Sequence, residues 1–146
     1  MTNYIQGLYK PNQPLKYIGD INQIVYRSSW ELRAFKWADN NENIIEWSSE
    51  PFPIKYFDHS TNKFRRYFPD LYLKVKDKNN DTKRYIVEIK PEKQTKPPQQ
   101  RKKKTKTYLN EIATYQKNVS KWSQAEKFCE DNNMLFKILT ETDLGI

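Results

Sequence analysis

Glycine, cysteine and histidine are scarce in this sequence of 146 residues, and each scarcity excludes a class of protein. The three glycines are not clustered, so the chain has no glycine-rich phosphate-binding loop. The single cysteine, Cys129, excludes an internal disulfide, and we expect it in the core on a helix stripe. The single histidine, His59, falls in a polar turn where we expect it to be exposed. Neither a structural zinc site nor a Ser-His-Asp triad is therefore expected.

Long apolar runs are also missing. No run approaches the ~20 residues that a membrane-spanning helix needs. The N-terminus has no basic region followed by an apolar stretch, so no signal peptide is expected. We therefore expect a soluble protein with no membrane partner. A chain of 146 residues is long enough for one hydrophobic core and too short for two ordinary domains.

Positive charge is abundant but unevenly distributed. The net charge is +8, and the segment from Lys93 to Lys106 holds seven cations and no acid. The remaining 19 basic residues nearly balance the 18 acidic ones. Such a block commonly binds polyanions. The alternative is a solvated, partly disordered linker, because charge runs are often found in linkers.

Hydrophobic periodicity predicts an extended arm over residues 1–20, followed by one α/β domain over residues 21–146. The first helix is expected to begin at Ser28, because Ser28 and Glu31 form a capping-box pattern. No internal repeat is visible. We expect strands at residues 44–48, 52–57, 64–75, 84–90 and 135–139, a long second helix at 104–131, and a basic loop at 93–106.

Two acids on neighbouring predicted strands are the most informative feature of the sequence. A hairpin register centred on Asn79 places Asp70 opposite Glu88, and strand alternation places Lys90 on the same face as Glu88. Opposed like charges destabilise a sheet, so the two acids indicate a cation between them. Oxygen ligands favour Mg²⁺ over zinc.

The triplet Asp/Glu-x-Lys proves little by itself, because roughly two or three copies are expected by chance in a chain so rich in acids and lysines. It occurs at residues 81–83, in a polar turn, and at residues 88–90, within a run of strand formers. Only the second copy has the context of a buried strand. An ordinary salt bridge between Lys90 and one of the acids remains the alternative interpretation.

These residues resemble the PD-(D/E)xK nuclease superfamily, whose metal site is named for this constellation. Within it, the chain resembles the head completion nucleases of T4-type tailed bacteriophages over essentially its whole length. It is similar, more distantly, to nuclease subunits of certain cut-and-paste transposons. The resemblance is carried by residues 17–20 and 25–31, by Pro69-Asp70 and Glu88-Ile89-Lys90, and by Tyr115, Asn118, Lys121 and Trp122 on the second long helix.

The resemblance implies a restriction-endonuclease-like core, with a central mixed sheet flanked by helices in the order α-β-β-β-α-β. It implies a DNA endonuclease that depends on Mg²⁺, with Mn²⁺ as a substitute, and that acts in phage head completion after DNA packaging. The implied partners are DNA and phage head or neck proteins. The implied locations are the host cytoplasm during assembly and the phage head in the virion.

The resemblance also assigns roles to particular residues. Asp70, Glu88 and the backbone carbonyl of Ile89 would hold Mg²⁺, and Lys90 would position the attacking water and offset charge on the phosphate. Glu31 would orient a ligand water or assist a second ion. Glu31 has an alternative role as the third residue of a capping box, which is worth about 1 kcal/mol without any part in catalysis.

DNA binding is expected to depend on backbone contacts with little sequence specificity. One alternative function is a catalytically silent DNA-binding structural protein of the phage head or neck. Another is a sequence-specific endonuclease of the restriction type, which would need base-reading elements. We expect most aromatic residues in the core rather than stacked on bases. The predicted DNA-binding residues are Lys93, Lys96, Arg101, Lys102, Lys103, Lys104, Lys106, Lys117 and Lys121.

Overall fold

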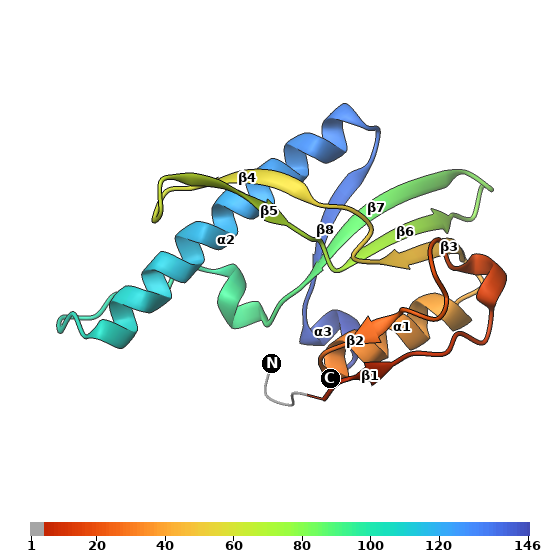
Figure 1. The fold of residues 1–146 in the computed structure, drawn as a ribbon, viewed down its shortest axis with the longest axis horizontal. Helices are drawn as coiled ribbons and strands as arrows, with labels where there is room; N and C mark the ends of the chain where they lie inside the picture. The colour runs from red at the N-terminus through yellow and green to blue at the C-terminus, as the bar shows by residue number, and fades with distance from the viewer. Residues whose placement is uncertain (1–4) are drawn as a thin grey trace.

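A four-stranded sheet lies at the centre of the computed structural model, which describes residues 5–146 (Figure 1). Its strands, in spatial order, are β3 (Ile44–Ser49), β6 (Leu71–Lys76), β7 (Thr82–Ile89) and β8 (Leu135–Leu139). β6 is antiparallel to both β3 and β7, whereas β8 is parallel to β7. The predicted α/β class with a central mixed sheet is therefore confirmed.

Helix α1 (Ser29–Asn40) packs on one face of this sheet. It begins as predicted, because Ser28 is the N-cap and its hydroxyl accepts a hydrogen bond from the Glu31 backbone N–H at 3.1 Å. Phe35 from the helix and Trp47 from β3 are both fully buried, with ring centroids 5.4 Å apart. Alternate residues of β7, Val87 among them, complete this core.

The segment before α1 lies along that helix. It contains β1 (Gly7–Leu8), the 3-10 helix η1 (Pro14–Lys16) and β2 (Val25–Tyr26), which pairs with β1. The Tyr9 hydroxyl donates to buried Asp39 of α1 at 2.6 Å. The Lys16 ammonium donates to three carbonyls at the end of α1, at 2.8 to 2.9 Å. Residues 1–4 of the predicted arm lie outside the described residues.

Strands β4 (Ile54–Asp58) and β5 (Lys63–Tyr67) form a separate two-stranded hairpin. The prediction of one strand over residues 64–75 is wrong, because the chain leaves β5 at Tyr67 and enters β6 of the central sheet only at Leu71. Pro69 lies in the break. Proline has no N–H to donate, so it interrupts a paired strand and suits a junction between two sheets.

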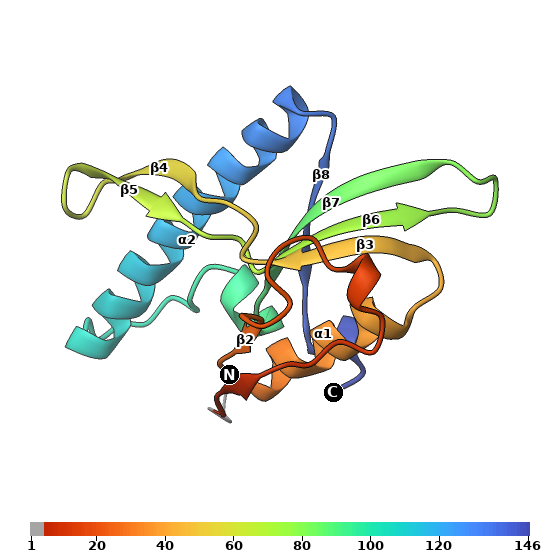
Figure 2. The same cartoon turned by 45° about the vertical axis from the view of Figure 1, so that its right-hand side comes forward.

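The long helix α2 (Lys106–Asp131) packs against this hairpin and on the face of the central sheet opposite to α1 (Figure 2). A second core forms there from Ile54, Tyr56, Tyr67 and Ala125. Cys129, also on α2, is 2% exposed, so its predicted core position is confirmed. His59 is exposed in the turn of the hairpin, as predicted.

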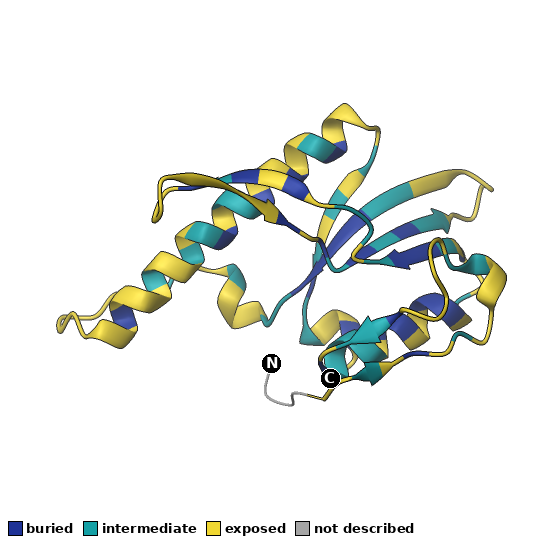
Figure 3. Ribbon diagram, viewed as in Figure 1, coloured by how far each residue is buried: buried dark blue, intermediate teal, exposed yellow. Residues whose placement is uncertain are grey.

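Three short helices were not predicted from the sequence, and η1, within the predicted extended arm, is the first of them. The 3-10 helix η2 (Glu92–Thr95) follows β7, and α3 (Glu141–Leu144) follows β8. Residues 96–105 have no regular structure and lead to α2, whose N-cap is Thr105. Figure 3 shows that burial is concentrated in the central sheet and in α1, while the first turns of α2 and the tip of the β4–β5 hairpin are largely exposed.

Candidate active site

Asp70 directly precedes β6 and Glu88 is the last residue but one of β7. These two strand ends meet near the middle of the molecule (Figure 2). The β6–β7 register pairs Leu71 with Val87, so one further step places Asp70 opposite Glu88, as the hairpin centred on Asn79 predicts. The Asp70 carboxylate also accepts a hydrogen bond from the Ile89 backbone N–H at 2.7 Å. The sequence-based geometry is therefore confirmed at the level of the strand register.

The two carboxyl groups interact with each other. Burial raises the pKa of Asp70 well above its ordinary value, and the adjacent Glu88 raises that pKa further. The hydrogen bond from Ile89 opposes this shift only in part. Two adjacent acids, of which Glu88 is buried and Asp70 half-buried, favour either a shared proton or a cation between them.

Side chains from two other elements hold Glu88 in place. The Tyr67 hydroxyl, at the end of β5, donates a hydrogen bond to the Glu88 carboxylate. The indole N–H of Trp122, on α2, donates to the same oxygen at 3.3 Å. Burial and the Glu88 charge both raise the pKa of Tyr67, so Tyr67 remains protonated and acts as a donor. Glu88 is 6% exposed and its orientation is determined by these contacts.

Glu31 approaches this pair from the first turn of α1. Its charge contributes to the raised pKa of Asp70, after burial and the adjacent Glu88. Burial raises the pKa of Glu31, whereas hydrogen bonding to Ser28 lowers it. The Ser28 hydroxyl lies 3.3 Å from the Glu31 carboxylate. Glu31 thus lies in the capped first turn of α1 as predicted, whereas its role at the metal stays a prediction.

Lys90 follows β7 directly, and its backbone N–H donates to the Leu139 carbonyl at 3.0 Å. Burial lowers the pKa of Lys121 on α2, and the charge of Lys90 lowers it further. The charge of Glu88 acts in the opposite direction on Lys121. Lys121 on α2 is therefore subject to the charges of both Lys90 and Glu88, and the position of the Lys90 side chain beside the acids stays a prediction.

The remaining predicted DNA-binding residues divide into two groups. Lys117 lies 3.6 Å from the buried carboxylate of Asp58, and Lys121 lies over the rings of Tyr56 and Tyr67, at 5.7 and 5.8 Å. All predicted cations before α2, and the first residue of that helix, are exposed. Within residues 5–146 one of these has an ion-pair partner, since Lys96 lies 3.6 Å from Glu92. The exposed group comprises Lys93, Lys96, Arg101, Lys102, Lys103, Lys104 and Lys106.

Sequence reasoning missed a further acid beside Asp70. The Glu50 backbone N–H, just after β3, donates to the Asp70 carbonyl at 3.1 Å. Glu50 has a φ of 45°, in the left-handed region that non-glycine residues rarely adopt. Its carboxylate forms a 2.5 Å ion pair with Arg27. The charges of both residues act on the pKa of Glu31, so the pair belongs to the surroundings of the site.

Tyr67 and Trp122 were also not assigned a role in holding Glu88 from the sequence. The partners of Glu88 come from two elements that are distant in the chain, so no local motif could predict them. For Glu50, the following Pro51 would have predicted an extended backbone, which Glu50 does not adopt.

The donor set at the site fits Mg²⁺. Within residues 5–146 no three Asp, Glu, His or Cys side chains are grouped as a metal cage. Magnesium does not require such a cage, because it commonly uses one or two carboxylates and takes its other ligands from water and substrate phosphates. Asp70 and Glu88 are such a pair, and a cation would relieve their repulsion. The carbonyl of Ile89 as a third ligand remains a prediction.

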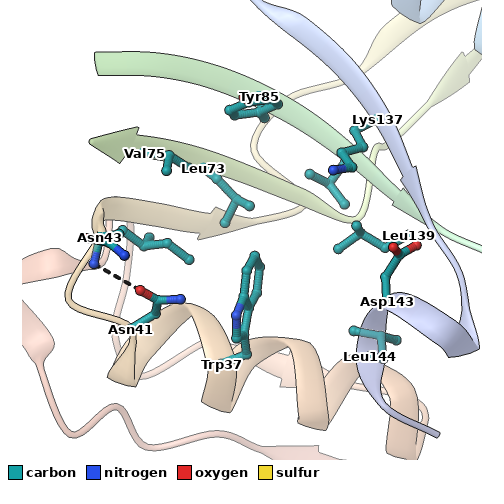
Figure 4. A pocket seen from close by; sticks show the side chains of 12 residues that line it. Trp37, Asn41, Asn43, Leu73, Val75, Tyr85, Lys137, Leu139, Asp143 and Leu144 are labelled. Carbon is teal, nitrogen blue, oxygen red and sulfur yellow. Dashed lines mark hydrogen bonds between the residues drawn. The ribbon is translucent and has the colours of Figure 1, made fainter. Parts of the chain in front are cut away.

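A pocket of about 360 Å³ lies elsewhere, between α1, α3 and the α1-facing side of the sheet (Figure 4). Trp37 points into it from α1, Leu73 from β6, and Asp143 and Leu144 from α3. None of the four predicted catalytic residues lines this pocket. The acid pair thus lies at the ends of the interior strands β6 and β7, separate from this largely apolar pocket.

The fold and the paired acids define a nuclease of the restriction-endonuclease-like class. Residues 41–141 match the family described as TnsA-like endonuclease N terminal, so the chain belongs to this family of nucleases. The head completion nuclease of enterobacteria phage T4 is 39% identical over 142 residues, which cover 94% of this chain and 92% of that protein. No solved structure matches the chain. The resemblance stated from the sequence is confirmed.

The family membership implies a nucleic-acid substrate, in agreement with the predicted DNA partner. Within the described part of the chain, no helix combines the length and the apolar character that crossing a membrane requires.

Proposed function

We propose that this nuclease is a Mg²⁺-dependent DNA endonuclease that acts in phage head completion after DNA packaging. The single observation that supports the metal dependence is the pairing of Asp70 with Glu88 at the ends of the two interior strands β6 and β7, where the pKa of Asp70 is raised. A structural protein would gain nothing from two opposed acids, because they repel each other.

Each residue of the site has a distinct part in phosphodiester hydrolysis. Asp70, Glu88 and the Ile89 carbonyl would hold Mg²⁺, or Mn²⁺ in its place. The bound ion supplies charge neutralisation on the phosphate and lowers the pKa of a water ligand. Lys90 positions the attacking water and offsets the charge that develops on the phosphate. Glu31 orients a ligand water from the side of α1 or assists a second ion.

The exposed cations of the basic loop, residues 93–106, hold the DNA backbone next to the site. The loop follows β7 almost directly, since η2 begins two residues after Lys90. Phosphate contacts of this kind carry little sequence information. We therefore expect cleavage with little sequence specificity.

The role in head completion derives from the similarity to the T4 protein of that name. It implies phage head or neck proteins as partners. It also implies a location in the host cytoplasm during assembly and in the phage head afterwards. The degree of identity, over nearly the whole of both chains, supports this assignment.

Incubation of the purified protein with supercoiled and linear DNA tests the proposal. We expect nicked and linear products with Mg²⁺ or Mn²⁺, and none with EDTA. Binding of DNA without cleavage under any of these conditions would identify a catalytically silent DNA-binding protein. A fixed set of discrete fragments would instead identify a sequence-specific endonuclease of the restriction type.

A further inference from the structure

The β4–β5 hairpin has two faces of very different character. Ile54, Tyr56 and Tyr67 point toward α2 and are buried, and their neighbours in each strand point away from it. This alternation is the ordinary period of a strand. We call the face that points away from α2 the outer face. It comprises Lys55, Phe57, Phe64, Arg66 and, just beyond β5, Phe68.

The outer face is positively charged and contains no acid. Lys55 and Arg66 are direct partners in the β4–β5 register, so two cations oppose each other across the hairpin. Opposed like charges destabilise a sheet. The acid of this hairpin, Asp58, points toward α2 and pairs there with Arg65 and Lys117. The repulsion on the outer face is thus uncompensated within the described residues, and an anionic partner would relieve it.

Large aromatic rings lie between these cations. Phe64 is 64% exposed and Phe68 is 45% exposed. The Lys55 ammonium lies 4.5 Å from the centroid of the Phe64 ring, and the Arg66 guanidinium lies 5.9 Å from that of Phe68. These residues line a shallow pocket of about 620 Å³. Exposed rings that alternate with cations are the arrangement by which proteins bind single-stranded nucleic acid.

The hairpin leads directly to the acid pair. The residues after β5 run from Phe68 through Pro69 to Asp70, so Phe68 lies within about 7 Å of Asp70 along an extended chain. The last residue of β5, Tyr67, also donates a hydrogen bond to Glu88. Figure 2 shows the hairpin extending beside α2 from the point where it joins the central sheet. A strand bound along the outer face would end at the site.

We propose that the outer face of the β4–β5 hairpin binds an unpaired segment of DNA, with bases stacked on Phe64 and Phe68 and phosphates held by Lys55 and Arg66. This inference rests on the proposed nuclease function, and it names the preferred substrate as DNA with a single-stranded portion next to the duplex. The basic loop and the outer face then bind two different parts of that substrate.

Binding to labelled DNA in EDTA tests this proposal without cleavage. The probes are a blunt duplex and the same duplex with a single-stranded overhang. We expect the wild type to bind the overhang probe more tightly. Phe64→Ala should lower affinity for the overhang probe about fivefold or more, and affinity for the blunt duplex less than twofold. Phe64→Trp should retain the preference, because the indole ring also stacks.

The proposed phosphate contacts of Lys55 and Arg66 are tested with the double variant Lys55→Gln/Arg66→Gln. We expect this double variant to reduce the salt dependence of overhang binding by about 1.4 units of log-log slope, since each of the two lost single-strand phosphate contacts removes ~0.7. The matched control is Lys76→Gln/Lys78→Gln, at the far end of the β6–β7 hairpin, which removes the same charge from another exposed hairpin. The control should leave the slope unchanged.

Two results would overturn the proposal. One is equal loss of blunt and overhang binding in Phe64→Ala, which would make the ring structural. The other is unchanged binding of both probes by Phe64→Ala and by Lys55→Gln/Arg66→Gln. That result would show that the outer face does not bind DNA and would indicate a protein partner instead. Failure of the nuclease function would appear separately, as absence of cleavage with Mg²⁺ by a wild type that still prefers the overhang probe.

Discussion

Asp58 and Asp70 lie at opposite ends of the same stretch of chain, and their surroundings shift their pKa values in opposite directions. Asp58 accepts hydrogen bonds from Ser60 and Thr61 and pairs with Arg65 and Lys117, so its pKa lies well below the ordinary range. Asp70 is half-buried next to Glu88, and its pKa is raised.

Burial alone therefore does not decide the role of an acid. Asp58 is 1% exposed, yet every contact around it favours the charged form, which makes it a structural anchor of the hairpin turn. Asp70 has one backbone donor and two acids in its vicinity. An acid that the fold leaves in repulsive surroundings is a candidate for binding a cation.

The largest difference between variants of Asp70 and of Asp58 should appear in the rate of DNA cleavage. We expect Asp70→Asn to lower Mg²⁺-dependent cleavage by about three orders of magnitude or more, because it removes a charge that holds the ion. Glu88→Gln should behave in the same way. Asp58→Asn should stay within about threefold of the wild type, since Asp58 is remote from the chemistry. Initial rates of cleavage of supercoiled DNA measure these effects. An equal loss of rate in all three variants would show that Asp70 and Asp58 do not differ in their importance for catalysis.

A second difference concerns the lysines associated with the two acids. Lys90→Ala should lower turnover at saturating DNA by about a hundredfold or more, with little change in DNA affinity, because its proposed role is in the transition state. Lys117→Ala should instead affect affinity or stability and leave turnover unchanged.

Single-turnover rates and binding in EDTA separate these outcomes. Weaker binding with unchanged turnover in Lys90→Ala would show that Lys90 is a simple phosphate contact. The proposed catalytic role of Lys90 would then be wrong.

The basic loop should act independently of either aspartate. Replacing Arg101, Lys102, Lys103 and Lys104 by Gln should weaken binding to all sequences and reduce the log-log salt slope by up to about three or four units, at ~0.9 per phosphate contact. Turnover at saturating DNA should persist. Identical slopes for the wild type and this variant would show that the loop is only a solvated linker.

The smallest expected effect is on thermal stability, where replacing Asp58 and replacing Asp70 should shift the melting temperature in opposite directions. In EDTA at neutral pH, Asp58→Asn should lower the melting temperature by several degrees, because Asp58 loses favourable contacts. Asp70→Asn should raise it slightly, because the substitution removes repulsion from Glu88 and keeps an acceptor for the Ile89 N–H. Thermal melts measure both shifts.

The pH dependence of these shifts follows from the pKa directions. The stability that Asp58 contributes is present above the unfolded pKa, about 3.9, and is lost as the pH falls through its depressed folded pKa. For Asp70 the folded pKa is raised, so the wild type loses stability as the pH rises from about 3.9 toward that folded value. The Asp70→Asn difference from the wild type should therefore grow as the pH rises above about 4, whereas the Asp58→Asn difference should be constant there and shrink below about pH 4. A Tm difference for Asp70→Asn that does not change with pH would contradict the raised pKa.

Local sequence was sufficient to predict a good part of this protein. The cap at Ser28 depends on a hydroxyl and an N–H three residues apart, and the Asp70–Glu88 register depends on a short turn and strand alternation. Both are governed by neighbours in the chain. The paired acids, the central sheet and the core position of Cys129 were accordingly predictable, and the resemblance built on those residues led to the correct family.

Tertiary structure alone decided the rest, because the contacts involved join segments distant in the chain. The separation of β5 from β6 was missed, since an apolar-polar alternation continues across the break and only the packing of the hairpin on α2 reveals it. The donors to Glu88 and the ion pair of Glu50 with Arg27 required the assembled fold. The outer face of the β4–β5 hairpin also became visible only there, because periodicity shows which residues share a face and packing decides which face is exposed.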